Sequence, residues 1–102
     1  MIARITWDKG WKRVRARRLG NFCLHRNGAF WTLTHTASGH YVQNILLHDE
    51  GIKLAKVLNA LPVDWRFRES KGPRWEKVKA VMVPVLRAFL RDNLSLLWKG
   101  KA

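Results

Sequence analysis

The stretch NFCLHRNGAFWTLT, residues 21–34, decides the fold. Its centre, Asn27-Gly28, is a dipeptide typical of two-residue hairpin turns, and the residues on either side alternate in polarity. A turn on this pair gathers four apolar side chains on one face: Leu24 opposite Trp31, and Phe22 opposite Leu33. The other face then receives Cys23 opposite Thr32, His25 opposite Phe30, and Asn21 opposite Thr34.

Two further turns extend this hairpin. Ser38-Gly39 returns the chain through residues 40–45, with Val42 on the apolar face and Gln43 on the polar one. Asp8-Lys9-Gly10 would join residues 2–7 to residues 11–18. The sequence therefore predicts a three- or four-stranded antiparallel meander over residues 1–46. Its polar side would carry Arg13, Arg15, Arg17, His25, Phe30, Thr32 and Tyr41.

Helical patterns follow the predicted sheet. Residues 49–61, with Asp49 as the N-cap, place an apolar stripe along one helix face: Leu54, Val57, Leu58 and Leu61. Residues 63–67 alternate and suggest a short edge strand or a loop. A second stripe within residues 73–98 predicts a kinked helix, or two helices, because Pro84 lies inside it. That stripe comprises Trp75, Val78, Met82, Val85 and Phe89, and a final apolar cluster comprises Leu94, Leu96, Leu97 and Trp98. The expected fold is one α+β domain over residues 1–102.

Charge is the strongest global signal. The 102 residues hold 20 Lys and Arg against 7 Asp and Glu, a net charge of +13. Residues 1–28 and 66–102 each carry a net +7, whereas residues 29–65 carry −1. Such an excess destabilises a compact chain and points to an anionic partner. Nucleic acid comes first, then an acidic protein surface. A generic solubility charge is the alternative.

The cysteine content and the apolar runs of the sequence indicate the compartment of the protein. The single cysteine, Cys23, excludes an internal disulfide and fits a reducing compartment. The amino-terminal residues lack the long apolar stretch of a signal peptide. The longest apolar run, residues 80–86, is too short to span a bilayer. We therefore expect a cytoplasmic protein with no membrane partner.

An arginine cluster near the start is the first candidate binding site. Arginine presents a planar fork that suits phosphate oxygens. On a strand, alternate side chains stand about 7 Å apart, so a strand can follow a phosphate backbone. The alternatives are a charged edge strand that prevents aggregation, and a basic arm that orders on binding. The cluster comprises Lys12, Arg13, Arg15, Arg17 and Arg18.

A second basic set and two aromatic residues complete the candidate site. The second set lies around the start of the second predicted helix, where an anion is well received, although a solvated face is an equal alternative. Phe30 and Tyr41 fall on the polar side of the sheet and are candidates for stacking on bases; the alternative is packing under a terminal segment. The basic residues of this set are Arg66, Arg68, Lys71, Arg74, Lys77 and Lys79, of which the first four are the candidate binding residues.

Catalysis and metal binding receive little support. The four histidines, His25, His35, His40 and His48, match no zinc-binding spacing, and the carboxylates are scattered. Phosphate-binding loops and nucleophile motifs are absent from the sequence. We expect neither cofactor, metal nor enzymatic activity. A small metal-free nuclease that uses His25 or His35 with a nearby lysine is the alternative left open.

Residues 20–61, GNFCLHRNGAFWTLTHTASGHYVQNILLHDEGIKLAKVLNAL, resemble in layout the DNA-binding domains of plant ethylene-response factors and the amino-terminal domains of tyrosine integrases. Both families place three strands before one packing helix, and the resemblance implies that an exposed sheet face enters the major groove. Thr32, Thr34 and Gln43 stand where those families carry arginine and tryptophan, so no base-reading residue is transferred.

The short basic chain also resembles small phage or plasmid accessory proteins, including CRISPR–Cas inhibitors. This resemblance implies a second hypothesis, a protein–protein inhibitor. Its basic face would occupy an acidic or nucleic-acid-handling surface of a larger enzyme.

Overall fold

The structure, a computed structural model, describes residues 1–7, 10–69 and 71–93. It confirms the α+β class and the antiparallel four-stranded meander followed by helices. No helix within these ranges is long and apolar enough to cross a membrane. In chain order the elements are β1 (Ile2–Trp7), β2 (Gly10–Arg15), β3 (Arg17–Leu19), β4 (Phe22–Asn27), β5 (Phe30–His35), β6 (His40–Ile45), α1 (His48–Asn59) and α2 (Gly72–Asn93).

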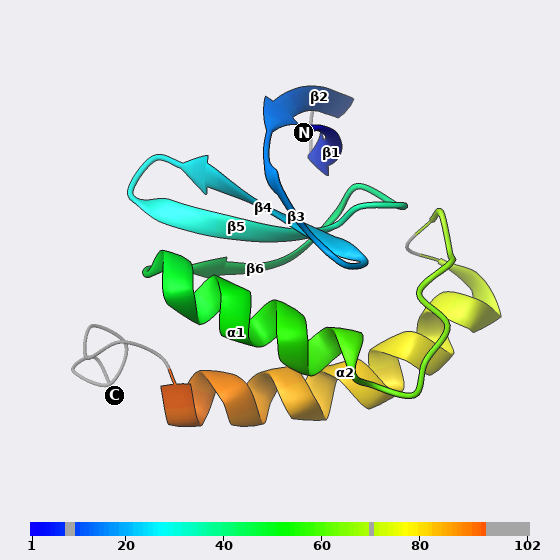
Figure 1. Ribbon diagram of the computed structural model, residues 1–102. Coiled ribbons are helices and arrows are strands. Elements are labelled where there is room, and N and C mark those ends of the chain that lie inside the picture. The colour runs from blue at the N-terminus through cyan, green and yellow to red at the C-terminus, as the bar shows by residue number, and fades with distance from the viewer. Residues whose placement is uncertain (8–9, 70, 94–102) are drawn as a thin grey trace.

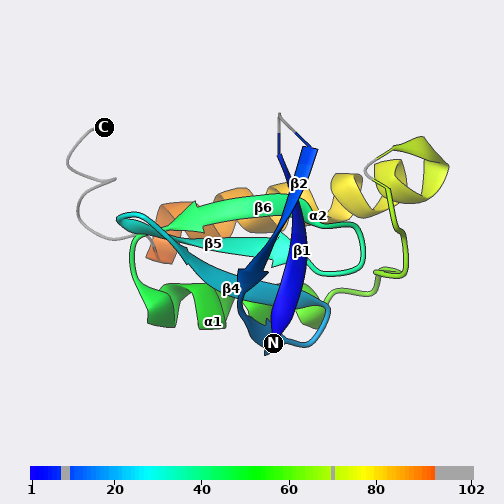
Figure 2. The same cartoon turned by 90° about the horizontal axis from the view of Figure 1, so that it is seen from above.

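The elements form layers on the two sides of one sheet. Strands β3, β4, β5 and β6 pair in that order, while β1 and β2 form a separate two-stranded hairpin. Figure 1 shows α1 and α2 on one side of the sheet and the hairpin on the other. Seen from above, the hairpin crosses the sheet strands instead of extending them (Figure 2).

The hairpin corrects the expectation of one continuous meander over residues 1–46. Met1 and Ala16 exchange both backbone hydrogen bonds, at 2.9 and 3.0 Å, so the ladder between β1 and β2 continues to Ala16. Arg17 then pairs with Leu24 in the other sheet. The chain therefore passes from one sheet to the other at Ala16. Arg13, Arg15 and Arg17 were expected on one face of one sheet, but Arg13 and Arg15 belong to the hairpin and Arg17 belongs to the four-stranded sheet.

The register of the β4–β5 hairpin differs by two residues from the predicted one. Its two-residue turn is Gly28-Ala29, not Asn27-Gly28, and Asn27 pairs with Phe30. Gly28, the first residue of the turn, has the positive φ of 63° that this position needs in a hairpin turn. Ala29, the second residue, does not have a positive φ. A shift of two preserves parity, so the two faces were predicted correctly although the partners were wrong: Leu24 pairs with Leu33, and Phe22 with His35.

A bulge in the next pairing moves Gln43 to the other face. The register of β5 and β6 shifts between Leu33 and Thr34, so Gln43 lies opposite Leu33 on the helix side. Asn44 lies opposite Thr32 and takes the position on the polar face that the sequence assigned to Gln43. Parity counting cannot detect such an inserted residue.

The core lies between the sheet and the helices. Its fully buried side chains come from the sheet and α1, and include Phe22, Leu24, Leu33, Ile45, Leu54 and Leu58. At Gly51 an added Cβ would lie 2.8 Å from a Leu24 methyl, so glycine allows α1 to approach the sheet closely.

Two details of the α1 prediction are wrong. The N-cap is Leu47, with no side-chain cap bond, and Asp49 lies within the first turn. Its charge still interacts favourably with the positive end of the helix dipole there. Val57, predicted on the buried stripe, is 39% exposed. Ala55 is buried in the core instead.

The segment after α1 joins the helices to the sheet. Residues 63–67 form a loop, not a strand, yet they still alternate: Trp65 and Phe67 are buried and Arg66 is exposed. Helix α2 is a single element that contains Pro84, and its stripe residues Val78, Met82 and Phe89 belong to the core. The predicted cluster of Leu94, Leu96, Leu97 and Trp98 lies outside the described residues.

Candidate nucleic-acid interface

The hairpin covers the polar face of the sheet. Ala3 and Ile5 are its buried inner residues, and Thr6 donates hydrogen bonds from its backbone N–H and its Oγ1 to the Gly39 carbonyl, at 2.8 and 3.0 Å. Beneath it, His25 and Thr32 are buried. The predicted polar side of the sheet is therefore not one exposed surface. The resemblance to integrase domains implies an open sheet face, but in the described residues the hairpin covers that face.

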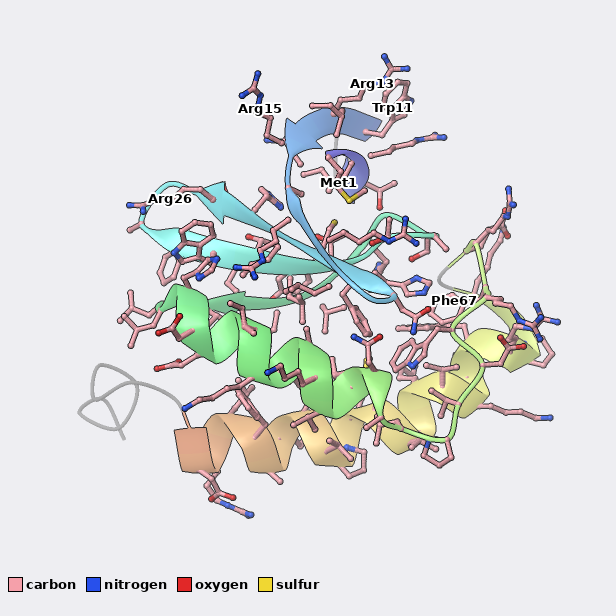
Figure 3. All side chains as sticks on the ribbon, in the orientation of Figure 1. Met1, Trp11, Arg13, Arg15, Arg26 and Phe67 are labelled. Atoms are coloured by element: carbon pink, nitrogen blue, oxygen red, sulfur yellow. The ribbon has the colours of Figure 1, made fainter. Side chains whose placement is uncertain are left out.

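The outer face of the hairpin is open and basic. Cross-strand pairs there place Arg4 opposite Arg13, Thr6 opposite Trp11, and Ile2 opposite Arg15. The Arg4 guanidinium lies 4.6 Å from the centre of the Trp11 ring, and that of Arg13 lies 5.7 Å from it. Trp11 is 50% exposed. Figure 3 shows Trp11, Arg13 and Arg15 projecting away from the body of the protein.

This arrangement is electrostatically unfavourable without a partner. Like charges directly opposite on neighbouring strands destabilise a sheet, and Arg4 faces Arg13 in this way. The contacts with Trp11 offset part of that repulsion. Among the described residues, no carboxylate forms an ion pair with Arg4, Arg13 or Arg15. The hairpin thus presents positive charge that the described carboxylates do not neutralise.

The basic surface continues past the end of the hairpin. Arg15, Arg17 and Arg26 line one depression of about 620 Å³, together with the Trp31 ring. The Arg26 guanidinium lies 5.5 Å from the centre of that ring, and His48 contacts it edge-on at 4.6 Å. Figure 3 shows Arg26 at the far tip of the sheet. We call the combined surface the arginine surface: Arg4, Trp11, Arg13, Arg15, Arg17 and Arg26.

Arg18 belongs to a different basic region. It pairs opposite Cys23, so it points to the other side from Arg17, and it lines a depression of about 370 Å³ with Arg66 and Arg68. An adjoining depression of about 440 Å³ is lined by Arg66, Arg68, Lys71 and Arg74. The two basic ends of the chain therefore meet here. We call this region the loop surface: Arg18, Arg66, Arg68, Lys71 and Arg74.

The loop surface contains its own counter-ions. Arg66 Nε lies 3.0 Å from Asp64 Oδ1, and Lys71 Nζ lies 3.7 Å from Glu69 Oε2. Hydrogen bonds from Arg66 lower the pKa of the Asp64 carboxyl, and the same pairing raises the pKa of Arg66. All of these groups are exposed, so water and salt screen them. Its net positive charge is accordingly lower than its five cations suggest.

Lys12, Tyr41 and Phe30 occupy other positions. Lys12 alternates with Trp11 and Arg13 along β2 and therefore faces inward, where it lines a cleft of about 670 Å³ between the hairpin and the sheet. Tyr41 lines the same cleft and is 45% exposed. Phe30 lies beside the Gly28-Ala29 turn and is 36% exposed.

The histidines are embedded in the fold. His35 Nε2 donates to the Trp65 carbonyl at 2.6 Å, Nδ1 lies 2.8 Å from Ser38 Oγ, and the ring stacks on Phe67 at 4.2 Å. Burial lowers the pKa of His25, His35 and His40. Both ring nitrogens of His35 are thus engaged in contacts within the fold. The geometry at this residue does not support the role in acid–base catalysis that the nuclease hypothesis would give it. Within the described residues, three or more His, Cys, Asp or Glu side chains do not gather in a metal-binding arrangement.

Three members of the arginine surface were missed by sequence reasoning: Arg4, Trp11 and Arg26. Arg4 and Trp11 could have been found from the predicted hairpin of residues 2–7 and 11–18. The register of that hairpin places Arg4 opposite Arg13. Arg26 required the correct register of β4 and β5, in which it pairs with Trp31.

Comparison of the chain with protein-family models, with curated proteins and with solved structures gave no match.

Proposed function

We propose that the protein binds nucleic acid through the arginine surface. The observation that carries this proposal is a set of arginines around an exposed tryptophan with no carboxylate partner among the described residues. The arginines that stand on paired strands have their backbones fixed, which reduces the entropy lost when they hold a ligand. An array of fixed guanidinium groups is suited to phosphate oxygens.

The geometry supports a contact with the phosphate backbone. Arg13 and Arg15 are alternate residues of β2, so their side chains leave the strand about 7 Å apart. The Trp11 ring beside them offers an apolar platform for a sugar or a base. The loop surface is the natural secondary contact, since it is basic but partly neutralised.

A charge-matched pair of variants tests the proposal. Arg13→Gln/Arg15→Gln removes two charges from the arginine surface, and Lys56→Gln/Arg87→Gln removes two exposed charges from the helices. We expect the first variant to weaken binding of a labelled oligonucleotide by about tenfold or more, because phosphate contacts are lost. We expect a much smaller change for the second. Equal losses in fluorescence anisotropy titrations would refute a localised site.

An acidic protein surface is the second candidate partner. Met1, Ile2 and Trp11 are exposed beside the arginines, and Trp with Arg is a common pairing at the energetic centre of protein interfaces. This candidate predicts a stoichiometric protein partner that is retained from nuclease-treated lysate by wild-type protein and released by Trp11→Ala. Loss of all captured material after nuclease treatment would instead support nucleic acid as the ligand.

A further inference from the structure

The cleft beneath the hairpin has the size of a ligand site. Its volume of about 670 Å³ lies within the usual range of small-molecule pockets. The hairpin forms one wall, and the polar face of the sheet forms the other. The lining residues that matter here are Lys12, His25, Asn27, Thr32, Tyr41 and Asn44.

The sheet wall carries an ordered chain of hydrogen bonds. Asn27 Nδ2 donates to Thr32 Oγ1 at 3.4 Å, and Thr32 Oγ1 donates to Asn44 Oδ1 at 2.7 Å. These bonds fix both side-chain amides, and they use the Nδ2 group of Asn27 and the Oδ1 atom of Asn44. Asn44 Nδ2 and Asn27 Oδ1 have no partner among the described residues. The wall therefore offers a donor and an acceptor held in fixed positions.

A buried side chain that borders the same cleft also carries a polar atom without a partner among the described residues. His25 is 4% exposed, and its Nδ1 makes no hydrogen bond within the described part of the chain. Burial, and then the positive charge of Lys12, lower the pKa of this ring, which favours the neutral form of the imidazole. Buried polar groups without partners are rare in proteins, and each calls for an explanation such as a bound molecule.

The remaining walls supply one aromatic ring and one cation. Tyr41 exposes its ring at the cleft, and Lys12 reaches the cleft from β2. Lys12 and Arg13 are consecutive, so the cleft and the arginine surface lie on the two faces of one strand. A polyanion held on the outer face of the hairpin is therefore close to the cleft.

We propose that the cleft receives one unstacked nucleotide of a single-stranded nucleic acid. The base stacks on Tyr41, its polar edge meets the amides of Asn27 and Asn44, and the phosphate lies toward Lys12. Paired amide donors and acceptors are suited to base edges, and an aromatic ring is suited to the face of any base. This inference rests on the proposed function and adds a preference for single strands over duplexes.

Two aromatic variants provide the test. Tyr41→Ala removes the ring that lines the cleft, and Phe30→Ala removes an aromatic ring beside the β4–β5 turn. We expect Tyr41→Ala to weaken binding of a single-stranded oligonucleotide by about tenfold and to leave duplex binding within about twofold, because one base-stacking contact is lost. We expect Phe30→Ala to change neither affinity by more than about twofold.

The outcomes separate this inference from the proposed function. If Tyr41→Ala and Phe30→Ala behave alike while Arg13→Gln/Arg15→Gln still weakens binding, the cleft inference fails and the arginine surface stands. If the arginine variant has no effect, the proposed function fails. A direct measurement is ¹H–¹⁵N NMR with nucleoside monophosphates. We expect shifts of the Asn27 and Asn44 side-chain amides, and an absence of shifts at millimolar nucleotide would overturn the inference.

Discussion

The two faces of the four-stranded sheet are made by the same strands and behave differently. On the helix side, Phe22, Leu24 and Leu33 are fully buried and pack on α1 and α2. On the hairpin side, His25 and Thr32 are also buried, but they are polar and border a cleft. The alternation of a β-strand thus separates an apolar face that packs in the core from a polar face that borders the cleft under the hairpin.

The largest expected effect is the difference in stability lost when alanine replaces one residue on each face of β5. Leu33→Ala should reduce the free energy of unfolding by about 2–5 kcal/mol, because it opens a cavity in the core. Thr32→Ala, one residue away, should cost about 1 kcal/mol through the lost bond to Asn44. Urea unfolding of both variants measures the difference. Similar losses would show that the hairpin side stabilises the fold as much as the helix side does.

The next effect concerns how the hairpin is held on the sheet. Gly39 and Gly28 both have positive φ, at 71° and 63°, so alanine at either position costs about 1–2 kcal/mol in backbone strain. At Gly39 a Cβ would also lie 3.0 Å from the Arg4 carbonyl, whereas at Gly28 it would meet nothing within 4 Å.

We therefore expect Gly39→Ala to destabilise the fold by about 1–3 kcal/mol more than Gly28→Ala. Faster hydrogen exchange at the Thr6 amide, which bonds to Gly39, should accompany it. Equal effects of the two variants in urea unfolding would mean that the hairpin is not held through Gly39.

The smallest expected effect is a loss of stability in mild acid. Burial lowers the pKa of His25, His35 and His40 below the ordinary value of 6.5. The unfolded chain therefore binds more protons than the folded one below about pH 6.5, so stability is complete above that pH and decreases as the pH falls.

Unfolding by urea at pH 7.5 and 5.5 measures this change, and NMR titration of the ring protons assigns it. We expect lower stability at pH 5.5, with ring midpoints below 6.5. Unchanged stability together with midpoints at 6.5 would contradict the buried, neutral state of these rings.

Local patterns predicted the elements well because their causes are local. The glycine turns, the alternation in β4 and β5, and the apolar stripe of α2 each depend on residues close in sequence. One inserted residue, Val42, and a turn displaced to Gly28-Ala29 were enough to change the pairing. Hydrophobic alternation specifies a face, but it does not specify a partner.

The candidate site could not be assembled from the sequence, because its geometry depends on distant contacts. The break at Ala16 sends Arg15 and Arg17 into different sheets, although both line one depression. Arg18 meets Arg66 only because the loop after α1 returns to the sheet, where His35 bonds to the Trp65 carbonyl. Neither event leaves a signal within a short stretch of residues.

The dependence of nucleic-acid affinity on salt tests the central claim most directly. For wild-type protein, the plot of log affinity against log salt should have a slope of about −0.7 per phosphate contacted on a single strand. Arg13→Gln/Arg15→Gln should make that slope less negative by about 1.4, corresponding to two lost contacts. A wild-type slope near zero, or an unchanged slope in the variant, would contradict binding by the arginine surface.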